Sequence, residues 1–123
     1  MCLVLNDATK HIATKDITTY KVVAITNETM HAIWQFFEYK CHKLYKLSVP
    51  LCTYTLFNSD IVTINGFYSF DNWDDAWNMH LYCVDKSRYT TKIVKCVLPK
   101  GTEYYTTNNT IVSNQIIIIE KCV

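Results

Sequence analysis

The sequence predicts an α+β fold: a single domain over residues 1–123 with a mostly antiparallel sheet and one or two helices. First, most apolar segments are short, rich in β-branched and aromatic residues and bounded by turn residues, which is typical of strands. Second, a helical spacing of apolar residues is clear in one segment only, after Asp71. Third, the composition of 50% hydrophobic and 19% charged residues suffices for one core in 123 residues.

The composition also excludes several classes of protein. Intrinsic disorder combines low hydrophobicity with high net charge, whereas this chain has a formal net charge of +1. Lysine and arginine are never adjacent, so no basic stripe for bulk nucleic acid is expected. The start of the chain lacks a signal-peptide pattern, and no apolar run approaches the roughly 18 residues that span a bilayer. We therefore expect a cytoplasmic protein without a membrane partner, whose six cysteines stay reduced.

The first strong strand signal lies at residues 17–25, a β-branched and aromatic run that ends at a turn or a helix cap. Two interpretations of the next segment stay open. The apolar spacing over residues 30–37 predicts a short helix capped by Asn27. The bulky aromatic residues nearby fit a strand over residues 35–40 equally well.

The middle of the chain is predicted to form short strands. Residues 44–57 nearly alternate in polarity, but Pro50 cannot donate to a ladder, so this stretch is predicted to be an edge or irregular strand. Residues 60–70 place two strand-like runs around Asn65 and Gly66. Because this dipeptide tolerates positive φ, it predicts a tight hairpin or a bulge.

The clearest helix follows directly. Asp71 is the predicted N-cap, and two aspartates in the first turn suit the positive end of the helix dipole. The apolar face is predicted to comprise Trp73, Ala76, Trp77, His80 and Leu81.

The last third of the chain reads as strands again. Residues 90–98 form a strand closed by a Pro-Lys-Gly turn, and residues 103–105 continue into a polar loop at 106–109. Four consecutive isoleucines at 116–119 show no alternation of polarity, which predicts a strand covered on both faces. The last strand is therefore predicted to be the central one.

Groups of metal-binding residue types occur, but their spacing is unconvincing. His80 and Cys83 share a helix face and Cys41 adjoins His42, yet the paired spacing of zinc ligands is absent. The aspartates near residue 71 are explained by helix capping and the dipole. We expect neither a metal nor a cofactor.

Four segments of the chain look familiar together. They are Met1-Cys2-Leu3 leading to Lys15-Asp16-Ile17 and Tyr20-Lys21-Val22-Val23; Gly66-Phe67-Tyr68-Ser69-Phe70 with Asp75-Ala76; Lys95-Cys96-Val97-Leu98-Pro99-Lys100-Gly101-Thr102 with Tyr104-Tyr105; and Val112-Ser113-Asn114. They resemble a group of short uncharacterised proteins from bacteria and their phages. In that group a Tyr-Lys-Val strand precedes a Gly-Phe-His-Ser/Ala-Phe turn, a helix and a strand ending in Pro-Lys-Gly. The group supplies no assigned activity, and the position often held by histidine is Tyr68 here, which argues against catalysis by this residue.

A looser similarity is to the ADP-ribosyltransferase-like fold. There a basic or histidine residue on the first strand, a small hydroxyl residue on a central strand and an acidic residue on a late strand surround a dinucleotide. In this chain Lys21 (or Tyr20), Ser69 and Glu120 fall in the corresponding order. The similarity implies a shape of cleft rather than transfer chemistry.

These observations favour a small binding protein of phage or prophage type that sequesters a nucleotide-derived defence signal. A ring would stack on tyrosine or phenylalanine, and a lysine or the single arginine would hold a phosphate. The predicted ligand-binding residues are Tyr20, Lys21, Tyr68, Ser69, Phe70, Arg88 and Asn114.

Two other functions stay open. The first is a protein-interaction inhibitor that adds its weakly charged edge, residues 44–57, to a sheet of a host protein. The second is an ADP-ribosyltransferase-like or nucleotide-processing enzyme with Glu120 as its catalytic acid. The expected partners are thus a nucleotide-type ligand or a host protein, and a homo-oligomer stays open.

Overall fold

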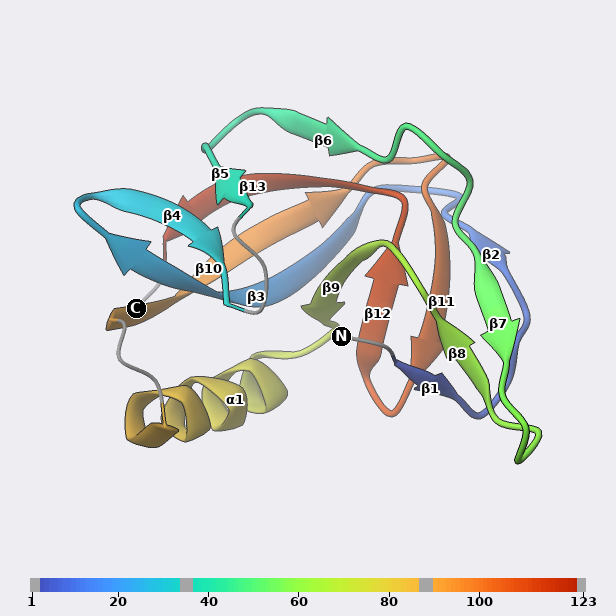
Figure 1. The fold of residues 1–123 in the computed structure, drawn as a ribbon. Coiled ribbons are helices and arrows are strands. Elements are labelled where there is room, and N and C mark those ends of the chain that lie inside the picture. Colours follow the sequence, from blue (N-terminus) through green and yellow to red (C-terminus); the bar gives the residue numbers. More distant parts are fainter. Residues whose placement is uncertain (1–2, 34–36, 87–89, 122–123) are drawn as a thin grey trace.

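Two long strands organise the sheet. In the computed structural model, which describes residues 3–33, 37–86 and 90–121, β3 (Ile17–Thr26) and β10 (Thr90–Leu98) pair antiparallel (Figure 1). Their ladder runs from the pair Thr90 and Ile25 to the pair Leu98 and Ile17. Both strands are rich in β-branched residues, which suit a pleated, buried surface. The strands predicted over residues 17–25 and 90–98 are thereby confirmed.

The remaining strands extend this ladder into a large sheet and a small one. The small sheet has the order β1 (Val4–Leu5), β8 (Ile61–Thr63), β7 (Thr53–Thr55). The large sheet has the order β2 (His11–Ile12), β11 (Glu103–Thr107), β12 (Thr110–Ser113), β9 (Phe67–Phe70), β3, β10, β13 (Gln115–Lys121), β6 (Leu44–Lys46). All these strand pairs are antiparallel, and one helix lies among the described residues, so the predicted α+β class is confirmed.

One edge of β3 is shared by two different partners. Near its start, Tyr20 pairs with Phe70 of β9. Near its end, the strand pairs with β4 (Thr29–Ala32), which continues to β5 (Glu38–Tyr39). The two partners diverge between these points, at Lys21 and Val22. This divergence, called the fork below, positions the site.

The segment after β3 is a hairpin and not a helix. Asn27 and Glu28 have φ values of 50° and 65°, and two successive residues with positive φ form the tight turn that suits paired antiparallel strands. The helix predicted over residues 30–37 is therefore wrong, because Asn27 turns the chain back onto β3 instead of capping a helix. The strand interpretation is right at β5, while residues 34–36 lie outside the described residues.

Asn65 and Gly66 do not form the tight hairpin that was one of the two predicted alternatives. The strands on their two sides belong to different sheets: β8 pairs with β1 and β7, whereas β9 pairs with β12 and β3. The chain crosses between sheets at Gly66, which has a φ of 115°. A Cβ atom there would lie 2.5 Å from Val112 Cγ2 and 2.9 Å from Leu51 Cδ1, so only glycine fits this crossing.

The predicted helix is present as α1 (Trp73–Lys86), but its cap lies one residue later than expected. Asn72 Oδ1 accepts the backbone N–H of Asp75 at 2.9 Å, and Asn72 Nδ2 donates to the Asp75 carboxylate at 2.8 Å. Asn72, not Asp71, is therefore the N-cap, because its side chain reaches the third helical N–H.

Helix α1 covers one face of the sheet through small residues. Ala76 and Cys83 are buried and pack with Val22 and Ile93 of the central strands. Trp77 and Leu81 were predicted to face the core but are exposed. The prediction was wrong here because the apolar spacing spans more of the helix surface than the sheet covers.

The isoleucine-rich strand β13 is not central. It lies second from the edge of the large sheet, between β10 and the short β6. Ile116 and Ile118 are fully buried, whereas Ile117 and Ile119 are only half-buried. Burial thus alternates along the strand although all four residues are apolar. An unbroken apolar run does not by itself indicate that both faces of a strand are covered.

Residues 44–57 form edges, as predicted. The segment contributes β6 at the edge of the large sheet and β7 at the edge of the small one, with Pro50 between them. None of the described helices is both long and apolar enough to cross a membrane.

Replacing Gly66 with alanine is expected to destabilise the fold by about 2 to 4 kcal/mol, because a Cβ atom collides with Val112 and Leu51 and φ is strained. The matched control is Gly101→Ala. Gly101 also has positive φ, 91°, but no atom lies within 4 Å of its added Cβ, so a loss of about 1 kcal/mol is expected. Urea unfolding of both variants checks this, and equal losses would contradict the close packing at the sheet crossing.

Candidate functional site

A cavity of about 500 Å³ lies at the fork of β3. Lys21 and Val22 form its wall on β3, and the diverging partners supply the other sides. It is partly open to solvent, and its size falls within the range of small-molecule sites. The lining residues used below are Lys21, Phe37, Tyr39, Tyr45, Lys46, Phe67, Tyr68, Ser69 and Phe70.

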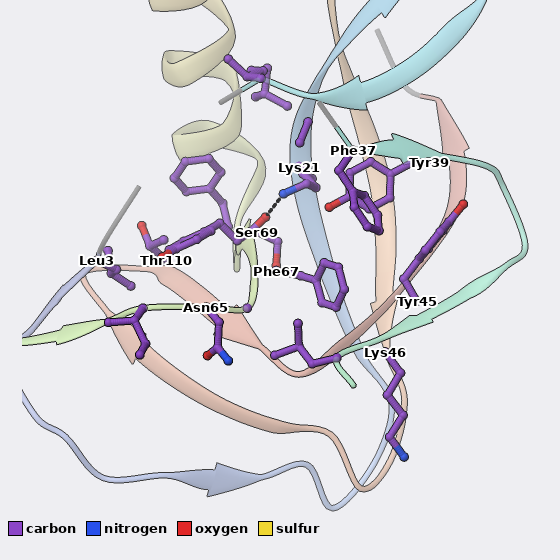
Figure 2. A pocket seen from close by; sticks show the side chains of 18 of the residues that line it. Leu3, Lys21, Phe37, Tyr39, Tyr45, Lys46, Asn65, Phe67, Ser69 and Thr110 are labelled. Atoms are coloured by element: carbon purple, nitrogen blue, oxygen red, sulfur yellow. Dashed lines mark hydrogen bonds between the residues drawn. The ribbon is translucent and has the colours of Figure 1, made fainter. Parts of the chain in front are cut away.

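Four aromatic rings form one wall of the cavity (Figure 2). Phe37 lies edge-on to Tyr39, Tyr45 and Phe67, with ring centroids 5.0, 5.5 and 6.0 Å apart. Tyr39 and Tyr45 are 5.2 Å apart in the same manner. Burial raises the pKa of the Tyr39 hydroxyl well above its usual value, so this ring stays neutral. The wall is therefore aromatic and uncharged.

Lys21 is the principal charged group of the cavity. Its side chain is only 8% exposed, and Nζ donates a hydrogen bond to the backbone carbonyl of Tyr68. Nζ also lies 5.6 Å from the centroid of the Tyr39 ring. An ammonium has three donors, so this carbonyl satisfies only one of them. Burial lowers the pKa of Lys21 from 10.5 to about 8, because desolvation disfavours the charged form.

Lys21 has no carboxylate partner in the part of the chain that the structure describes. The two described ion pairs join Lys10 to Glu103 and Lys95 to Glu120, both at the surface. None of the residues that line the cavity is acidic, and a second lysine, Lys46, lies at its exposed rim. The cavity is therefore positively charged. Buried charges in proteins are normally paired, so this lysine is unusual.

Ser69 adds a second polar group beside Lys21. Tyr20 and Phe70 are paired across β3 and β9, and Lys21 and Ser69, their neighbours at the start of the fork, both line the cavity. The Ser69 side chain is 1% exposed, and its hydroxyl has no hydrogen-bond partner among the described residues. An unpaired buried hydroxyl costs about 1 to 3 kcal/mol. Lysine and serine thus present unused hydrogen-bonding capacity at one place.

Four of the seven predicted site residues line this cavity: Lys21, Tyr68, Ser69 and Phe70. The Tyr68 hydroxyl is bound to Thr63 at 3.0 Å, so this residue contributes its backbone carbonyl and its ring rather than a free hydroxyl. Tyr20 does not line the cavity and packs edge-on against Trp73 of α1, with centroids 5.7 Å apart.

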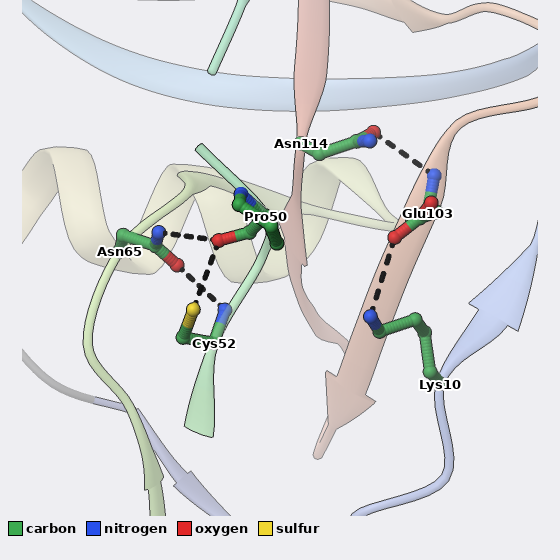
Figure 3. A network of polar contacts seen from close by, with 6 residues as sticks. All are labelled: Lys10, Pro50, Cys52, Asn65, Glu103 and Asn114. Carbon is green, nitrogen blue, oxygen red and sulfur yellow. Dashed lines mark hydrogen bonds and ion pairs between the residues drawn. The ribbon is translucent and has the colours of Figure 1, made fainter. Parts of the chain in front are cut away.

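Asn114 has a structural role, contrary to the prediction (Figure 3). Its side-chain Oδ1 accepts the backbone N–H of Glu103 at 2.9 Å, and its backbone carbonyl accepts the N–H of Leu47 at 2.9 Å. It thereby fixes the corner between β12 and β13. Arg88, the remaining predicted residue, lies outside the described residues.

The same figure shows a second structural amide near the cavity (Figure 3). Asn65 accepts the backbone N–H of Cys52 and donates to the carbonyl of Pro50, both at 2.9 Å. Although Asn65 borders the cavity, its side chain is occupied in holding the segment between β6 and β7.

The order shared with ADP-ribosyltransferase-like folds does not produce a three-residue site. Lys21 and Ser69 are brought together, but Glu120 lies outside the cavity. Its side chain is 60% exposed and lies 3.9 Å from Lys95. The prediction that Glu120 acts in the same cleft is therefore wrong, because the register of β13 on β10 places it at a surface cross-strand pair.

The aromatic wall is the part of the site that sequence reasoning missed. Phe37 and Tyr39 come from the segment after β4, for which helix and strand were both open, and Tyr45 comes from β6, in the stretch predicted to be an edge strand. The density of aromatic residues in this segment was the available signal. It indicated apolar packing but not which strand the rings would face.

The His80 and Cys83 pair shows no sign of metal chemistry. His80 Nδ1 lies 2.8 Å from the Thr91 hydroxyl, and Cys83 is buried, which raises the pKa of its thiol. Within the described residues, no group of three histidine, cysteine or acidic side chains is placed to hold a metal ion.

Comparisons of the chain with protein-family models, with curated proteins and with solved structures yield no match. The resemblance to short bacterial and phage proteins therefore stays a prediction, and the functional argument rests on the cavity itself.

The burial of Lys21 is expected to make stability depend on pH. Its pKa is about 8 in the folded protein and 10.5 in the unfolded chain, so between these values the unfolded chain binds more protons. Stability therefore rises with pH across this window, by roughly 3 kcal/mol if the whole shift is expressed. Below pH 8 the lysine is charged in both states, and the fold bears the full desolvation cost.

A Lys21→Met variant isolates this effect, because methionine has a similar length and no charge. The difference in unfolding free energy between variant and native protein, measured in urea from about pH 7 to about pH 10, is expected to favour the variant at neutral pH and to shrink as pH rises. Taking the difference cancels the titration of other groups. A difference that does not vary with pH would show that Lys21 is not desolvated.

Proposed function

We propose that this chain is a small-molecule binding protein whose cavity takes a nucleotide-derived ligand with a single negative charge. The observation that carries the proposal is the buried ammonium of Lys21, which has no carboxylate partner among the described residues and lies in the wall of a cavity of about 500 Å³. A ligand anion would supply the missing counter-charge. It would also use the two free donors of Lys21 and the unpaired hydroxyl of Ser69.

The charge of the cavity favours one negative charge over two. Lys21 is the one buried cation of the cavity, and Lys46 at the rim is exposed and so contributes little through solvent. An ion pair at about 4 Å is worth roughly 4 kcal/mol at the effective dielectric near a protein surface. A second ligand charge would be desolvated without an equivalent gain. A cyclic phosphodiester matches this pattern, whereas a phosphate monoester brings a second charge.

The aromatic wall favours a ligand with a flat ring. Phe37, Tyr39, Tyr45 and Phe67 give the cavity an extended apolar surface next to the charged group. Stacking of a base on an aromatic side chain is typically worth about 1 to 3 kcal/mol. A purine joined to a cyclic phosphodiester combines the ring and the single charge within a volume that this cavity accommodates.

Sequestration of a defence signal in a phage-infected host is the biological setting that we propose for this binding, and the sequence resemblance implies only the bacterial or phage origin. The host, the cellular compartment and the phage origin stay predictions.

A second candidate function is strand addition to another protein. Strand β7 is exposed along its length at the edge of the small sheet, and the loop that follows it presents Leu56 and a fully exposed Phe57. Exposed edges of this kind can pair with a strand of a partner. Retention of a host protein that Tyr54→Lys abolishes and that no nucleotide affects would favour this function.

Binding of 3′,5′-cyclic AMP, measured by isothermal titration calorimetry, is expected to exceed that of adenosine, which has the ring without the charge. Lys21→Met is expected to weaken binding by roughly 30-fold or more, because it removes an ion pair worth at least about 2 kcal/mol. Lys46→Met is the matched control, since it removes an exposed lysine of the same cavity, and a change below about threefold is expected.

The proposal fails if neither cyclic AMP nor cyclic GMP binds at millimolar concentration, or if the two lysine variants bind equally well. Because Lys21→Met is expected to stabilise the fold at neutral pH, lost binding by this variant would not be an effect of unfolding.

A further inference from the structure

We propose that Lys21 also captures small carbonyl compounds in this cavity by forming an imine between its side-chain nitrogen and an aldehyde or ketone. This inference rests on the proposed function in one respect only, that the cavity admits a small molecule. It assigns a covalent chemistry that reversible anion binding does not require.

The first requirement is a neutral amine, because an ammonium has no lone pair with which to attack a carbonyl carbon. Lys21 is the one buried lysine among the described residues. No carboxylate described by the structure holds its proton. Burial lowers its pKa to about 8, so a substantial fraction is neutral near physiological pH, whereas exposed lysines remain almost wholly charged.

The second requirement is that a carbonyl group reaches this nitrogen in a suitable environment. Lys21 lies in the wall of the cavity, and the rings of Phe37, Tyr39 and Phe67 surround this end of it (Figure 2). An apolar aldehyde would be bound by these rings with its carbonyl directed toward the polar pair of Lys21 and Ser69. The apolar walls would also limit the access of water that hydrolyses an imine.

The third requirement is a donor for the carbonyl oxygen. Ser69 lines the cavity together with Lys21, and its buried hydroxyl has no hydrogen-bond partner among the described residues. It would donate to the carbonyl oxygen as negative charge develops there during attack. This reaction would therefore give the Ser69 hydroxyl a hydrogen-bond partner, which the packing of the described residues does not provide.

The reaction balances without an oxidant, a reductant or a cofactor. The lone pair of the amine forms a bond to the carbonyl carbon, and the electron pair of the C=O π bond moves to oxygen. A proton passes from nitrogen to that oxygen through the Ser69 hydroxyl and gives a carbinolamine. The hydroxyl group of the carbinolamine then takes a proton from solvent and leaves as water, while the nitrogen lone pair forms the C=N bond and gives a protonated imine. A protonated imine retains one N–H, which can keep the bond to the Tyr68 carbonyl.

The test is reductive trapping with benzaldehyde and sodium cyanoborohydride, followed by intact-mass measurement and peptide mapping. Benzaldehyde carries no charge, so labelling does not depend on anion binding. We expect one benzyl group per chain, located on Lys21, added at least about tenfold faster than at Lys46. The rate is expected to rise with pH up to about pH 8, the pKa of Lys21, because the neutral amine is the nucleophile.

Three variants separate the outcomes. Lys21→Arg, which keeps the charge, should abolish selective labelling; Lys100→Met, which removes an exposed lysine outside the cavity, should leave it unchanged; and Ser69→Ala should slow it severalfold. Labelling spread over the exposed lysines, or a Lys21 that stays unlabelled in the folded protein, would overturn the inference.

These results can be told apart from those on the proposed function. Cyclic AMP binding without labelling of Lys21 would overturn the carbonyl chemistry alone. Selective labelling of Lys21 that cyclic AMP does not slow, in a protein that binds no cyclic nucleotide, would overturn the proposed nucleotide function alone.

Discussion

The desolvated ammonium of Lys21 is the constraint on which the account of this protein depends. A lysine inside a fold is normally paired with a carboxylate, yet the described residues place a backbone carbonyl, an aromatic ring, the Cys96 thiol and the hydroxyl of Ser69 near this one, and no carboxylate. The fold therefore bears a cost at neutral pH that a ligand can relieve. The same burial makes the nitrogen partly neutral. Anion binding and carbonyl capture thus both follow from the burial of Lys21 without a carboxylate. The charged ammonium would bind an anion, and the neutral amine would attack a carbonyl.

The cavity exists because one strand has two partners on the same edge. Strand β3 pairs with β10 over its full length, while its other edge passes from β9 to β4. A hairpin at Asn27 and Glu28 directs β4 back onto β3, and Gly66 lets the chain cross from the small sheet to β9. The hairpin and the crossing at Gly66 make β4 and β9 approach β3 from different directions. Lys21 therefore lies on β3 between its two partners. Phe37, Tyr39 and Tyr45 then supply the aromatic wall of the cavity.

Local patterns in the sequence predicted the α+β class, β3, β10 and α1, because each of these elements has its own periodicity or turn signals. Local patterns gave wrong predictions where contacts between distant segments determine the structure. Apolar residues over 30–37 fit a helical spacing, but positive φ at Asn27 and Glu28 makes a hairpin there. The Asn65 and Gly66 turn was correctly seen as a sharp turn, yet no local signal tells that its flanking strands enter different sheets. For the site, proximity to this turn identified Tyr68, Ser69 and Phe70, whereas the aromatic wall required the fold.

The charge state of Lys21 is best measured directly, by NMR titration of the side-chain carbon next to Nζ in protein labelled with ¹³C-lysine and assigned with Lys21→Arg. The account predicts a midpoint near pH 8 for Lys21, well below 10.5, while the exposed lysines titrate normally. It further predicts that saturating cyclic AMP raises this midpoint, since an anion beside the nitrogen favours the charged form. A midpoint near 10.5 in the free protein would contradict the central claim, because Lys21 would then be solvated and need no counter-charge.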